Sequence, residues 1–576
     1  MKKIVYILSI LFVLVILTSC SFNKIDDNDP ASYTNPDSSS TDTNQESSTS
    51  SDTDVSGSTV EIEIKEDDIE TDFVLLNEND EKLTFSDGKY TITEAGTYSA
   101  TGNLEGQIYV NVPDGKVELV LEGVSITSDT TSPIYVEDCD SFTLKVKKDT
   151  TNYVYDNRTT DYSSDSSALQ AAIYVKNGDL KVNGQGTLSV TSLYNSGLQS
   201  KDNVTVKNVT LLVKAMNNGI KGNDKVTIEE NPTIGIVAGN NGIVTSNSDL
   251  GSKAQHGYIY ITGGTITINS YGDGIDAAYA LEIYEGTDKE GNTYTPVIDI
   301  YTNKYSSYEL TTTTTNLTSI ISYGPGFPGG GFGGGGFGGG SSAEKANDSA
   351  KGLKATEYIK ISAGTIFTYT YDDGIHTNAD ALDNGSTAKG NITITGGTLK
   401  IKASDDGIHA DGTLSIEGGE VIVSESHEGI ESNIINISGG NTKVVANNDG
   451  VNASKEINIS GGYLDVTVSP NGDTDGIDSN GTITISGGTT ITRGPDNVNM
   501  APMDADGTMK MTGGILIVVG YSPRKLSTSL KKTTSSNGIS SGSHTVTIGE
   551  TTITYTNSYS YSGITTVYAN QSATIK

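Results

Sequence analysis

A short phrase that recurs through this chain of 576 residues constrains its fold more than any other feature. Each copy has two small polar residues, a glycine and an aliphatic residue, as in NNGI at 217–220 and DDGI at 372–375 and 405–408. The glycines of successive copies lie 22, 23, 32, 78, 22, 33, 22, 21 and 26 residues apart. A unit of about 22 residues therefore persists, with insertions in a few units, and such a period is typical of solenoids.

Between the phrases lie short stretches in which β-branched and polar residues alternate, such as ITITGGTLKI at 392–401 and INISGGYLDVTV at 457–468. Alternation broken by paired glycines predicts strands of about three to five residues joined by tight turns. We therefore expect an all-β parallel β-helix of about 22 residues per coil. A propeller or a sandwich is the alternative, but a propeller blade needs about 40 residues.

Stacked coils would place equivalent residues about 4.8 Å apart, which turns a sequence column into a physical ladder. An apolar content of only 34% suffices for the narrow interior of such a stack. We expect Asn195, Asn217 and Asn240 to form an asparagine ladder, with each side-chain amide bonding the backbone of the next coil.

The N-terminus has the features of an export signal. Two lysines precede an apolar run of 14 residues at 4–17, which is shorter than the roughly 20 residues needed to cross a bilayer. The segment LTSC at 17–20 resembles a bacterial lipobox, which predicts a lipoprotein signal peptide at 1–19 and lipidation of Cys20. The chain would then be lipid-anchored at the extracellular face of the bacterial membrane. The alternative is an ordinary secretory signal with a chance cysteine.

Composition divides the remainder of the chain. Residues 20–59 are rich in Ser, Thr and Asp and predict a disordered tether. A β-helix is expected at 60–520, with an insertion at 285–350 that contains a glycine-rich flexible loop at 324–340. Residues 521–576 are interpreted as a separate C-terminal β capping segment. The two cysteines are too few for a disulfide framework.

Charge restricts the class of partner. With 71 acidic residues against 37 basic ones, the net charge is -34, which argues against nucleic acid or any polyanion held by simple attraction. A partner would be neutral, cationic or bridged by a cation. We expect a monomer that contacts the membrane only through its lipid anchor.

Acidic residues gather at the repeated phrase. Carboxylates about 5 Å apart on successive coils would repel by about 3 kcal/mol, so such a row suits bound cations. Ca²⁺ takes six to eight oxygen ligands, which paired Asp residues and turn carbonyls can supply. The alternative is a solvated row of Asp-Gly turns, but the doubled acids exceed what turns require. The candidate ligands are Asp273, Asp276, Asp372, Asp373, Asp405, Asp406, Glu428, Asp449, Asp475 and Asp478.

Zinc is not expected, because clusters of Cys and His are missing, although His376, His409 and His427 lie beside the acidic column. A lysine beside calcium-loaded acids is the arrangement of a polyuronate lyase, in which a neutral amine removes the C5 proton of the uronate. Lys354, next to His376, is the best candidate for that base, with Lys221 second. A local counter-charge is the favoured interpretation of these lysines, so no catalytic residue is expected and enzyme activity is the alternative.

Several segments together resemble a known family. TITEAGTY at 91–98, VELVLEGVSI at 117–126, the Asp-Gly-Ile phrases followed by Ile-Ser-Gly-Gly strands, and the Gly-Phe insertion are similar to the bacterial carbohydrate-binding, pectate-lyase-like β-helix family of cellulolytic anaerobes. The resemblance covers about residues 60 to 520. It implies a right-handed parallel β-helix and binding of plant cell-wall polysaccharide, either acidic pectin (polygalacturonate) or cellulose, without established catalysis. It also implies calcium at Asp273, Asp373, Asp406, Asp449 and Asp475.

The early coils depart from the family pattern. Asn217, Asn218, Asn240 and Asn241 replace the acids there, which puts calcium in doubt and favours a structural ladder. The expected function is therefore a calcium-dependent carbohydrate-binding surface lipoprotein. The alternatives are a calcium-dependent pectate lyase and a purely structural or adhesive surface protein.

Overall fold

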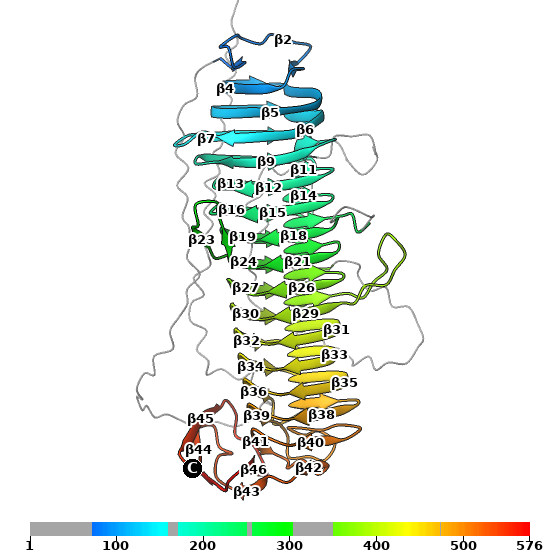
Figure 1. Ribbon diagram of the computed structural model, residues 1–576, viewed down its shortest axis with the longest axis vertical. Helices are drawn as coiled ribbons and strands as arrows, with labels where there is room; N and C mark the ends of the chain where they lie inside the picture. The colour runs from blue at the N-terminus through cyan, green and yellow to red at the C-terminus, as the bar shows by residue number, and fades with distance from the viewer. Residues whose placement is uncertain (1–71, 159–170, 250–255, 303–348, 473) are drawn as a thin grey trace, which may run out of the picture. The chain divides into compact units, whose positions relative to one another are not determined.

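The computed structural model describes residues 72–158, 171–249, 256–302, 349–472 and 474–576 (Figure 1). These residues belong to one of two compact units, Ile69–Thr312 with Tyr323–Lys576. Within them the chain is all-β, as predicted, with a sheet of 42 strands, a pair of strands and a three-stranded sheet. In this part of the chain no helix is present that could cross a membrane. The expected signal peptide, Cys20 and the tether lie outside the described residues.

Most strands belong to three parallel ladders, which the chain visits in turn, and one passage through all three is called a coil here. Figure 1 shows the strands of successive coils stacked in order along the chain. Each strand pairs with the equivalent strand of the coil before and the coil after. Within the first ladder, Ile220 pairs with Ile243 and Ile243 with Ile275. The repeated phrase therefore lies in register from coil to coil.

The first ladder directly follows the repeat glycines and consists of very short strands. Its members are β8 (Ala171–Val175), β11 (Ser196–Ser200), β14 (Ile220–Gly222), β17 (Ile243–Thr245), β20 (Ile275–Ala277), β25 (Leu353–Ala355), β28 (Ile375–Thr377), the first parts of β31 (Ile408–Ile416), β33 (Ile430–Ile437) and β35 (Val451–Ile459), and β37 (Ile477–Ser479).

The second ladder begins a few residues later in each coil. Its members are β9 (Asp179–Gly184), β12 (Asn203–Lys207), β15 (Lys225–Glu229), β18 (Tyr258–Ile261), β21 (Ala280–Ile283), β26 (Tyr358–Ile361), β29 (Asn391–Ile394), the last parts of β31, β33 and β35, β38 (Thr482–Ile485), β40 (Met509–Met511) and β42 (Leu526–Thr528).

The third ladder follows the Gly-Gly turns and leads back to the repeated phrase. Its members are β7 (Thr151–Asp156), β10 (Thr187–Ser192), β13 (Thr210–Ala215), β16 (Thr233–Ala238), β19 (Thr265–Ser270), β24 (Val297–Thr302), β27 (Thr365–Thr370), β30 (Thr398–Ala403), β32 (Glu420–Glu425), β34 (Asn441–Ala446), β36 (Tyr463–Val468), β39 (Thr489–Arg493) and β41 (Ile515–Gly520).

Part of the expected insertion at 285–350 is regular structure. Strand β24 lies inside that range and pairs in register with both β19 and β27. A two-stranded hairpin, β22 (Gly286–Thr287) with β23 (Thr293–Tyr294), precedes it. The remainder at 303–348, which includes the glycine-rich segment 324–340, lies outside the described residues.

Stacked aliphatic side chains fill the interior. Alternation along each strand sends one residue inward and the next outward, as in β26, where Ile359 and Ile361 are buried while Lys360 is exposed. The first ladder contributes at least one inward aliphatic residue per coil, and Ile375 and Ile408 in that column have no exposed surface. A narrow column of this kind explains how a chain of low apolar content has a continuous core.

The repeat glycines are required by close packing. A Cβ atom at Gly374 would lie 2.4 Å from Cγ2 of Ile401 and 2.6 Å from the carbonyl oxygen of Gly407 in the next coil. By contrast, the second glycine of a Gly-Gly turn, such as Gly419 with φ of 81°, has the left-handed conformation that favours glycine. Only the Gly-Gly turns therefore follow the turn chemistry that the sequence predicted.

The N-terminal coils are longer. Strand β1 (Val74–Leu76) runs antiparallel to β4 (Gly96–Glu105), and β2 (Phe85–Ser86) runs antiparallel to β3 (Lys89–Ile92). Strand β5 (Gln107–Ser128) is parallel to β3, β4, β6 (Ile134–Val146) and β7. Strand β5 pairs with β7, and β6 pairs with β8 and β9, so these longer strands precede the first strand of each ladder.

At the C-terminal end the pairing changes direction. Strands β43 (Lys531–Ser535) and β41 both pair antiparallel to β46 (Ile564–Ala569), and β44 (Gly542–Ile548) pairs antiparallel to β45 (Thr551–Asn557) and β47 (Ala573–Ile575). The fully buried Arg493 ties this cap to the coils, because its Nε donates to Oδ1 of Asn557 at 2.8 Å and its Nη1 bonds Asp465. The second ladder continues to β42, so antiparallel structure starts at β43.

Candidate functional site

Two outward-facing rows follow the repeated phrase along the stack. The turn row holds the residue before each repeat glycine, and the strand row holds the residue two positions after it. Within the strand row, Asp276 pairs with Lys354, Lys354 with His376, His376 with His409, and His409 with Glu431. The row continues through Asn452 to Asp478. The structure therefore brings the predicted site residues together on one edge.

In the turn row, one side-chain oxygen of a residue accepts a hydrogen bond from the backbone of the next coil. The backbone N–H of Asp406 donates to Oδ1 of Asp373 at 3.0 Å, and that of Asp475 donates to Oδ1 of Asp449 at 2.8 Å. In an earlier coil Asn241 takes the same place and accepts from the N–H of Asp273 at 2.9 Å. An acid or an amide in this row thus satisfies a backbone donor of the next coil.

The asparagine ladder is present, but its bonds differ from those expected. Asn217 Nδ2 donates to Oδ1 of Asn195 at 2.8 Å, and Asn240 Nδ2 donates to Oδ1 of Asn217 at 3.1 Å. These bonds join side chain to side chain. The neighbouring Asn218 makes the expected bond, accepting at 3.3 Å from the backbone of the next coil.

Lysines neutralise the acids in the middle coils. Lys354 Nζ lies 3.2 Å from Oδ2 of Asp273 and 3.6 Å from Oδ2 of Asp276, and Asp273 is buried. Burial raises the pKa of the Asp276 carboxyl to about 6, and Lys354 acts against that rise. Burial lowers the pKa of Lys354, but the nearby Asp276 and Asp273 more than offset this effect.

A second lysine fills the neighbouring position. Lys351 Nζ lies 2.8 Å from Oδ2 of Asp372 and 2.9 Å from Oδ2 of Asp373. Although burial opposes it, the attraction of these two acids leaves the pKa of Lys351 raised. Four of the candidate calcium ligands therefore already have an ammonium partner, and a calcium ion there would have to displace it.

The two lysines proposed as bases have different surroundings. Lys354 is held in its charged form by two carboxylates, whereas a base must be neutral. Burial, with a smaller effect of Lys201, lowers the pKa of Lys221. The strand-row neighbours of Lys221 are Gln199 and Val244, neither of which is acidic.

Histidines replace the lysines in the next two coils. His376 Nδ1 bonds Oδ2 of Asp373, and His409 Nδ1 lies 3.0 Å from Oδ2 of Asp406. Burial disfavours a charge on His409, but hydrogen bonds to Asp406 and Asp411 raise its pKa to about 11. Burial raises the pKa of Asp406 well above its usual value.

Acids without a cation occupy the C-terminal coils. Within the described part of the chain, no Lys, Arg or His nitrogen lies within 4.0 Å of the carboxylates of Asp475, Asp478 or Asp504. Burial, followed by the charge of Asp449, raises the pKa of Asp478 to about 6, and burial raises that of Asp475 to about 7. Asp504 follows Asp478 in the strand row and was not among the predicted ligands.

Glu428 belongs to the same acidic group. It lies in the turn row, and burial together with the charge of Glu431 raises its pKa to about 7. Asn452 Nδ2 donates to Oε2 of Glu428 at 3.3 Å. Carboxylates thus accumulate at this end of the two rows. The C-terminal acid group is defined here as Glu428, Asp449, Asp475, Asp478 and Asp504.

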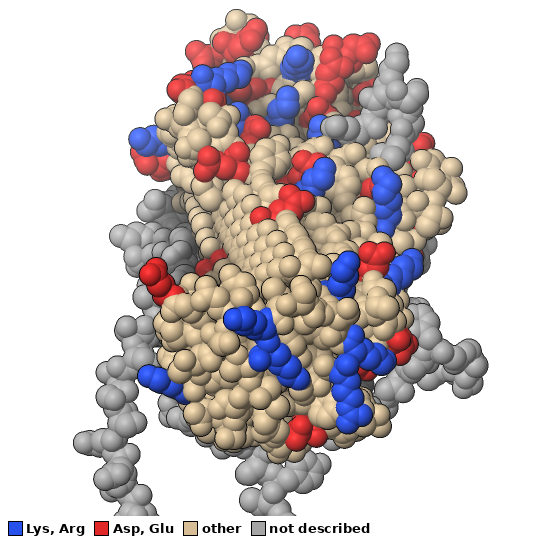
Figure 2. Space-filling model, turned by 60° about the horizontal axis from the view of Figure 1, so that its bottom comes forward, with Lys and Arg blue, Asp and Glu red and all other residues tan. Residues whose placement is uncertain are grey.

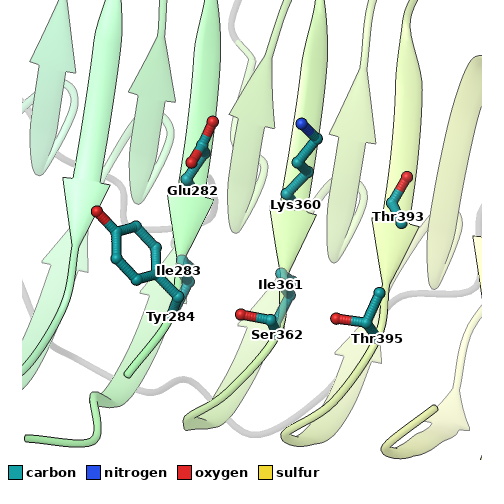
Figure 3. A pocket seen from close by; sticks show the side chains of 8 residues that line it. All are labelled: Glu282, Ile283, Tyr284, Lys360, Ile361, Ser362, Thr393 and Thr395. Carbon is teal, nitrogen blue, oxygen red and sulfur yellow. The ribbon is translucent and has the colours of Figure 1, made fainter. Parts of the chain in front are cut away.

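A shallow groove lies on the second ladder, away from these rows. Its volume is about 290 Å³, and it crosses β21, β26 and β29 (Figure 3). Figure 3 shows Glu282, Lys360 and Thr393 in one row and Tyr284, Ser362 and Thr395 in the next. Tyr284 is 38% exposed, which is unusual for a large side chain in this structure. The groove thus combines one aromatic surface with hydroxyls and one charge of each sign.

The C-terminal end differs in charge from the rest of the chain. Residues 507–576 hold six Lys or Arg and one acid, a net charge of +5, whereas the whole chain has -34. Figure 2 shows Lys and Arg gathered on the end that carries the cap. The overall charge therefore conceals a local basic surface, which the count of charged residues in 507–576 also indicates.

Comparison with known proteins found one matching family and similar proteins. The family described as carbohydrate-binding domain-containing protein matches residues 86–387 and 380–576. A protein of that description from Acetivibrio thermocellus is 31% identical over 140 residues, which cover 24% of this chain and 49% of the relative. The chain thus spans about half the length of the curated relative that it matches.

A solved structure is also similar in sequence. It is described as the polysaccharide lyase-like protein from C. thermocellum, in a gadolinium derivative, and it is 30% identical to this chain. The match covers 38% of this chain and 84% of that chain, with a TM-score of 0.33.

Proposed function

This chain belongs to the family of carbohydrate-binding domain-containing proteins, and we propose that it binds acidic plant cell-wall polysaccharide, such as polygalacturonate, through calcium held by the C-terminal acid group. The single observation that carries the proposal is that three acids of neighbouring coils, Asp475, Asp478 and Asp504, have no cationic partner within 4.0 Å among the described residues. The same rows hold lysines or histidines in the preceding coils.

The chemistry of the acid group fits calcium. Ca²⁺ prefers six to eight oxygen ligands at flexible positions, and neighbouring coils supply Asp449, Asp475, Asp478 and Asp504 at one edge. Burial is the main cause of the raised pKa values of Asp475 and Asp478, and repulsion from the nearby charge of Asp449 adds to both. A divalent cation would relieve this repulsion. The middle acids Asp273, Asp276, Asp372 and Asp373 fit calcium less well, because lysines already occupy their oxygens.

Calcium would also explain how an acidic protein holds an acidic glycan. Part of the coordination shell of the ion would come from Asp side chains, and uronate carboxylates would complete it. A neutral glycan such as cellulose lacks that ligand. The groove on the second ladder offers a further contact, because the ring of Tyr284 suits the apolar face of a sugar and Ser362 and Thr395 suit its hydroxyls.

We further infer that the three ladders form a single right-handed parallel β-helix. The support is the pairing order, in which β14, β15 and β16 pair with β17, β18 and β19 in turn. The helix would extend from the N-terminal coils to β42, with the strands from β43 onward as its cap.

The proposal includes attachment at the cell surface through a lipid on Cys20, with residues 20–59 as a spacer. Labelling of cells with a fatty-acid analogue tests this part. The unchanged chain should incorporate the label, and the Cys20→Ala chain should not. Equal labelling of both chains would contradict lipidation at Cys20.

Affinity electrophoresis tests the main proposal. The chain should be retarded in a gel that contains polygalacturonate when calcium is present, and a chelator should abolish the retardation. The double variant D475N/D478N should lose it, whereas D372N, which changes an acid already paired with Lys351, should keep it. Retardation that persists in chelator would refute calcium bridging, and equal retardation by a cellulose gel would refute selectivity for an acidic glycan.

A purely structural role for calcium gives a different result in the same experiment. Chelator would then lower the melting temperature of the chain but leave its retention by polygalacturonate unchanged. Measuring the melting temperature and the retardation by polygalacturonate on the same sample therefore distinguishes a structural role of calcium from a bridging role.

A further inference from the structure

Two histidines on adjacent coils stand beside one another in the strand row. The ring centroids of His376 and His409 are 4.6 Å apart, with an angle of 43° between the planes. Ligand atoms of Asp373, His376 and His409 all lie within 4.8 Å of one another. Two ligands of a tetrahedral zinc ion are about 3.3 Å apart, given bonds of about 2.0–2.1 Å. Small side-chain rotations would therefore bring these atoms to metal-binding distance.

Each imidazole is already oriented by a carboxylate. His376 Nδ1 bonds Asp373, and His409 Nδ1 lies 3.0 Å from Oδ2 of Asp406. Histidines that bind a metal commonly donate their other ring nitrogen to a carboxylate in this way. The contact leaves Nε2 of His376 for a metal, whereas Nε2 of His409 already lies 3.4 Å from Oδ1 of Asp411, where a metal ion would have to replace the shared proton. The repeated i, i+3 spacing places the same pair of acid and histidine in both coils.

Oxygen atoms are present on the Nε2 side. Asp411 Oδ1 lies 3.4 Å from Nε2 of His409. Asn378 directly follows β28, two residues after His376. Oδ1 of Asn378 is buried, and no hydrogen-bond partner for it is found among the described residues. An acceptor left in this state is costly unless a donor or a cation reaches it.

Several carboxylates also surround the two rings. Asp373, Asp406 and Asp411 contact the imidazoles, and Glu431 Oε2 lies 3.6 Å from Nδ1 of His409. Of these four acids, Lys351 contacts only Asp373. Within the described residues, no lysine or arginine nitrogen lies within 4.0 Å of the carboxylates of Asp406 or Asp411.

We propose that Asp373, His376 and His409, whose ligand atoms lie within 4.8 Å of one another, bind a borderline divalent metal ion such as Zn²⁺, with Asp406 and Asp411 as orienting residues of His409. Nitrogen ligands distinguish this site from the C-terminal acid group, because imidazole suits zinc whereas calcium prefers oxygen alone. The sequence indicated no zinc site, since the histidines lie 33 residues apart and meet only through the register of β28 and β31. The site does not depend on carbohydrate binding.

Calorimetric titration of the full chain with Zn²⁺, after removal of metals and with calcium in excess, tests the proposal. One saturable zinc ion per chain is expected. His376→Gln and His409→Gln should each weaken binding at least tenfold, and Asp406→Asn should weaken it about 10- to 100-fold as an orienting residue. His427→Gln is the matched control, because His427 is exposed and lies in the phrase of the next coil, and it should bind zinc like the unchanged chain.

A second measurement needs no variant. Co²⁺ bound to the unchanged chain should give the visible absorption of a site with nitrogen ligands, and Zn²⁺ but not Ca²⁺ should remove it. Absence of zinc binding, or an equal loss in His427→Gln, would overturn the proposal. Retention of zinc affinity by the H376Q/H409Q double variant would also overturn it. The two histidines of the unchanged chain would then be only ion-pair partners of their carboxylates.

Discussion

Lys354 Nζ lies 3.2 Å from Oδ2 of Asp273, a contact between coils that are separated by 78 residues at their repeat glycines. This ion pair shows how one outward row is neutralised in different ways along the stack. Lysine nitrogens contact the acids of the middle coils, and histidine nitrogens contact the acids of the next two coils. In the C-terminal acid group, Asp475 and Asp478 have no such partner among the described residues.

Removal of the lysine should therefore destabilise the fold. In Lys354→Met, Asp273 would be left as a buried charge without its partner, and a cost of about 3 kcal/mol in the free energy of unfolding is expected. Denaturant unfolding measures the change. Lys360→Met is a control on an exposed lysine and should cost less than about 0.5 kcal/mol. Equal stability of the two variants would contradict the structural role of Lys354.

Stability without metal should fall as pH rises through about 6 to 7. The folded-state pKa values of Asp478 and Asp475 are raised from 3.8 to about 6 and about 7, so the folded chain binds more protons than the unfolded chain in this window. The melting temperature in chelator should thus be higher at pH 5 than at pH 8. Saturating calcium should reduce this difference, and D475N/D478N should also reduce it. A melting temperature that rises over the same window would show that these two acids do not dominate.

The groove on the second ladder predicts a modest contribution to glycan affinity. Tyr284→Ala should weaken polygalacturonate binding by about 1 kcal/mol, or roughly fivefold, because an aromatic stacking surface is lost. Tyr559→Ala is the matched control, since both tyrosines are 38% exposed. Calorimetry with an oligomer of galacturonate would measure both variants. An equal effect of the two variants would remove the groove from the binding surface.

Close packing at the repeat glycine can be tested separately from turn conformation. Ala at Gly374 would place its Cβ 2.4 Å from Cγ2 of Ile401 and 2.6 Å from the carbonyl oxygen of Gly407. We expect a loss of about 1–3 kcal/mol in the free energy of unfolding, which is the usual range for overpacking. A neutral substitution would mean that the coils separate easily at this edge.

The repeat predicted much of the architecture, because its 22-residue period determines the strand order and the alignment of outward residues. Local pattern could not show which acids are neutralised. Lys351 and Lys354 lie three residues apart, yet Lys351 contacts Asp373 of the following coil and Lys354 contacts Asp273 of the preceding coil. Those contacts depend on register across a long interruption. The meeting of His376 with His409 depends on register in the same way.

The position of bound ions tests the central claim most directly, namely that calcium occupies the acids that lack a cationic partner. Crystals of the folded domain soaked with calcium should show ions beside Asp475, Asp478 and Asp504. The positions beside Lys351 and Lys354 should remain without calcium, because ammonium groups already contact those acids. Calcium at Asp273 and Asp276, with none at Asp475 and Asp478, would contradict the account.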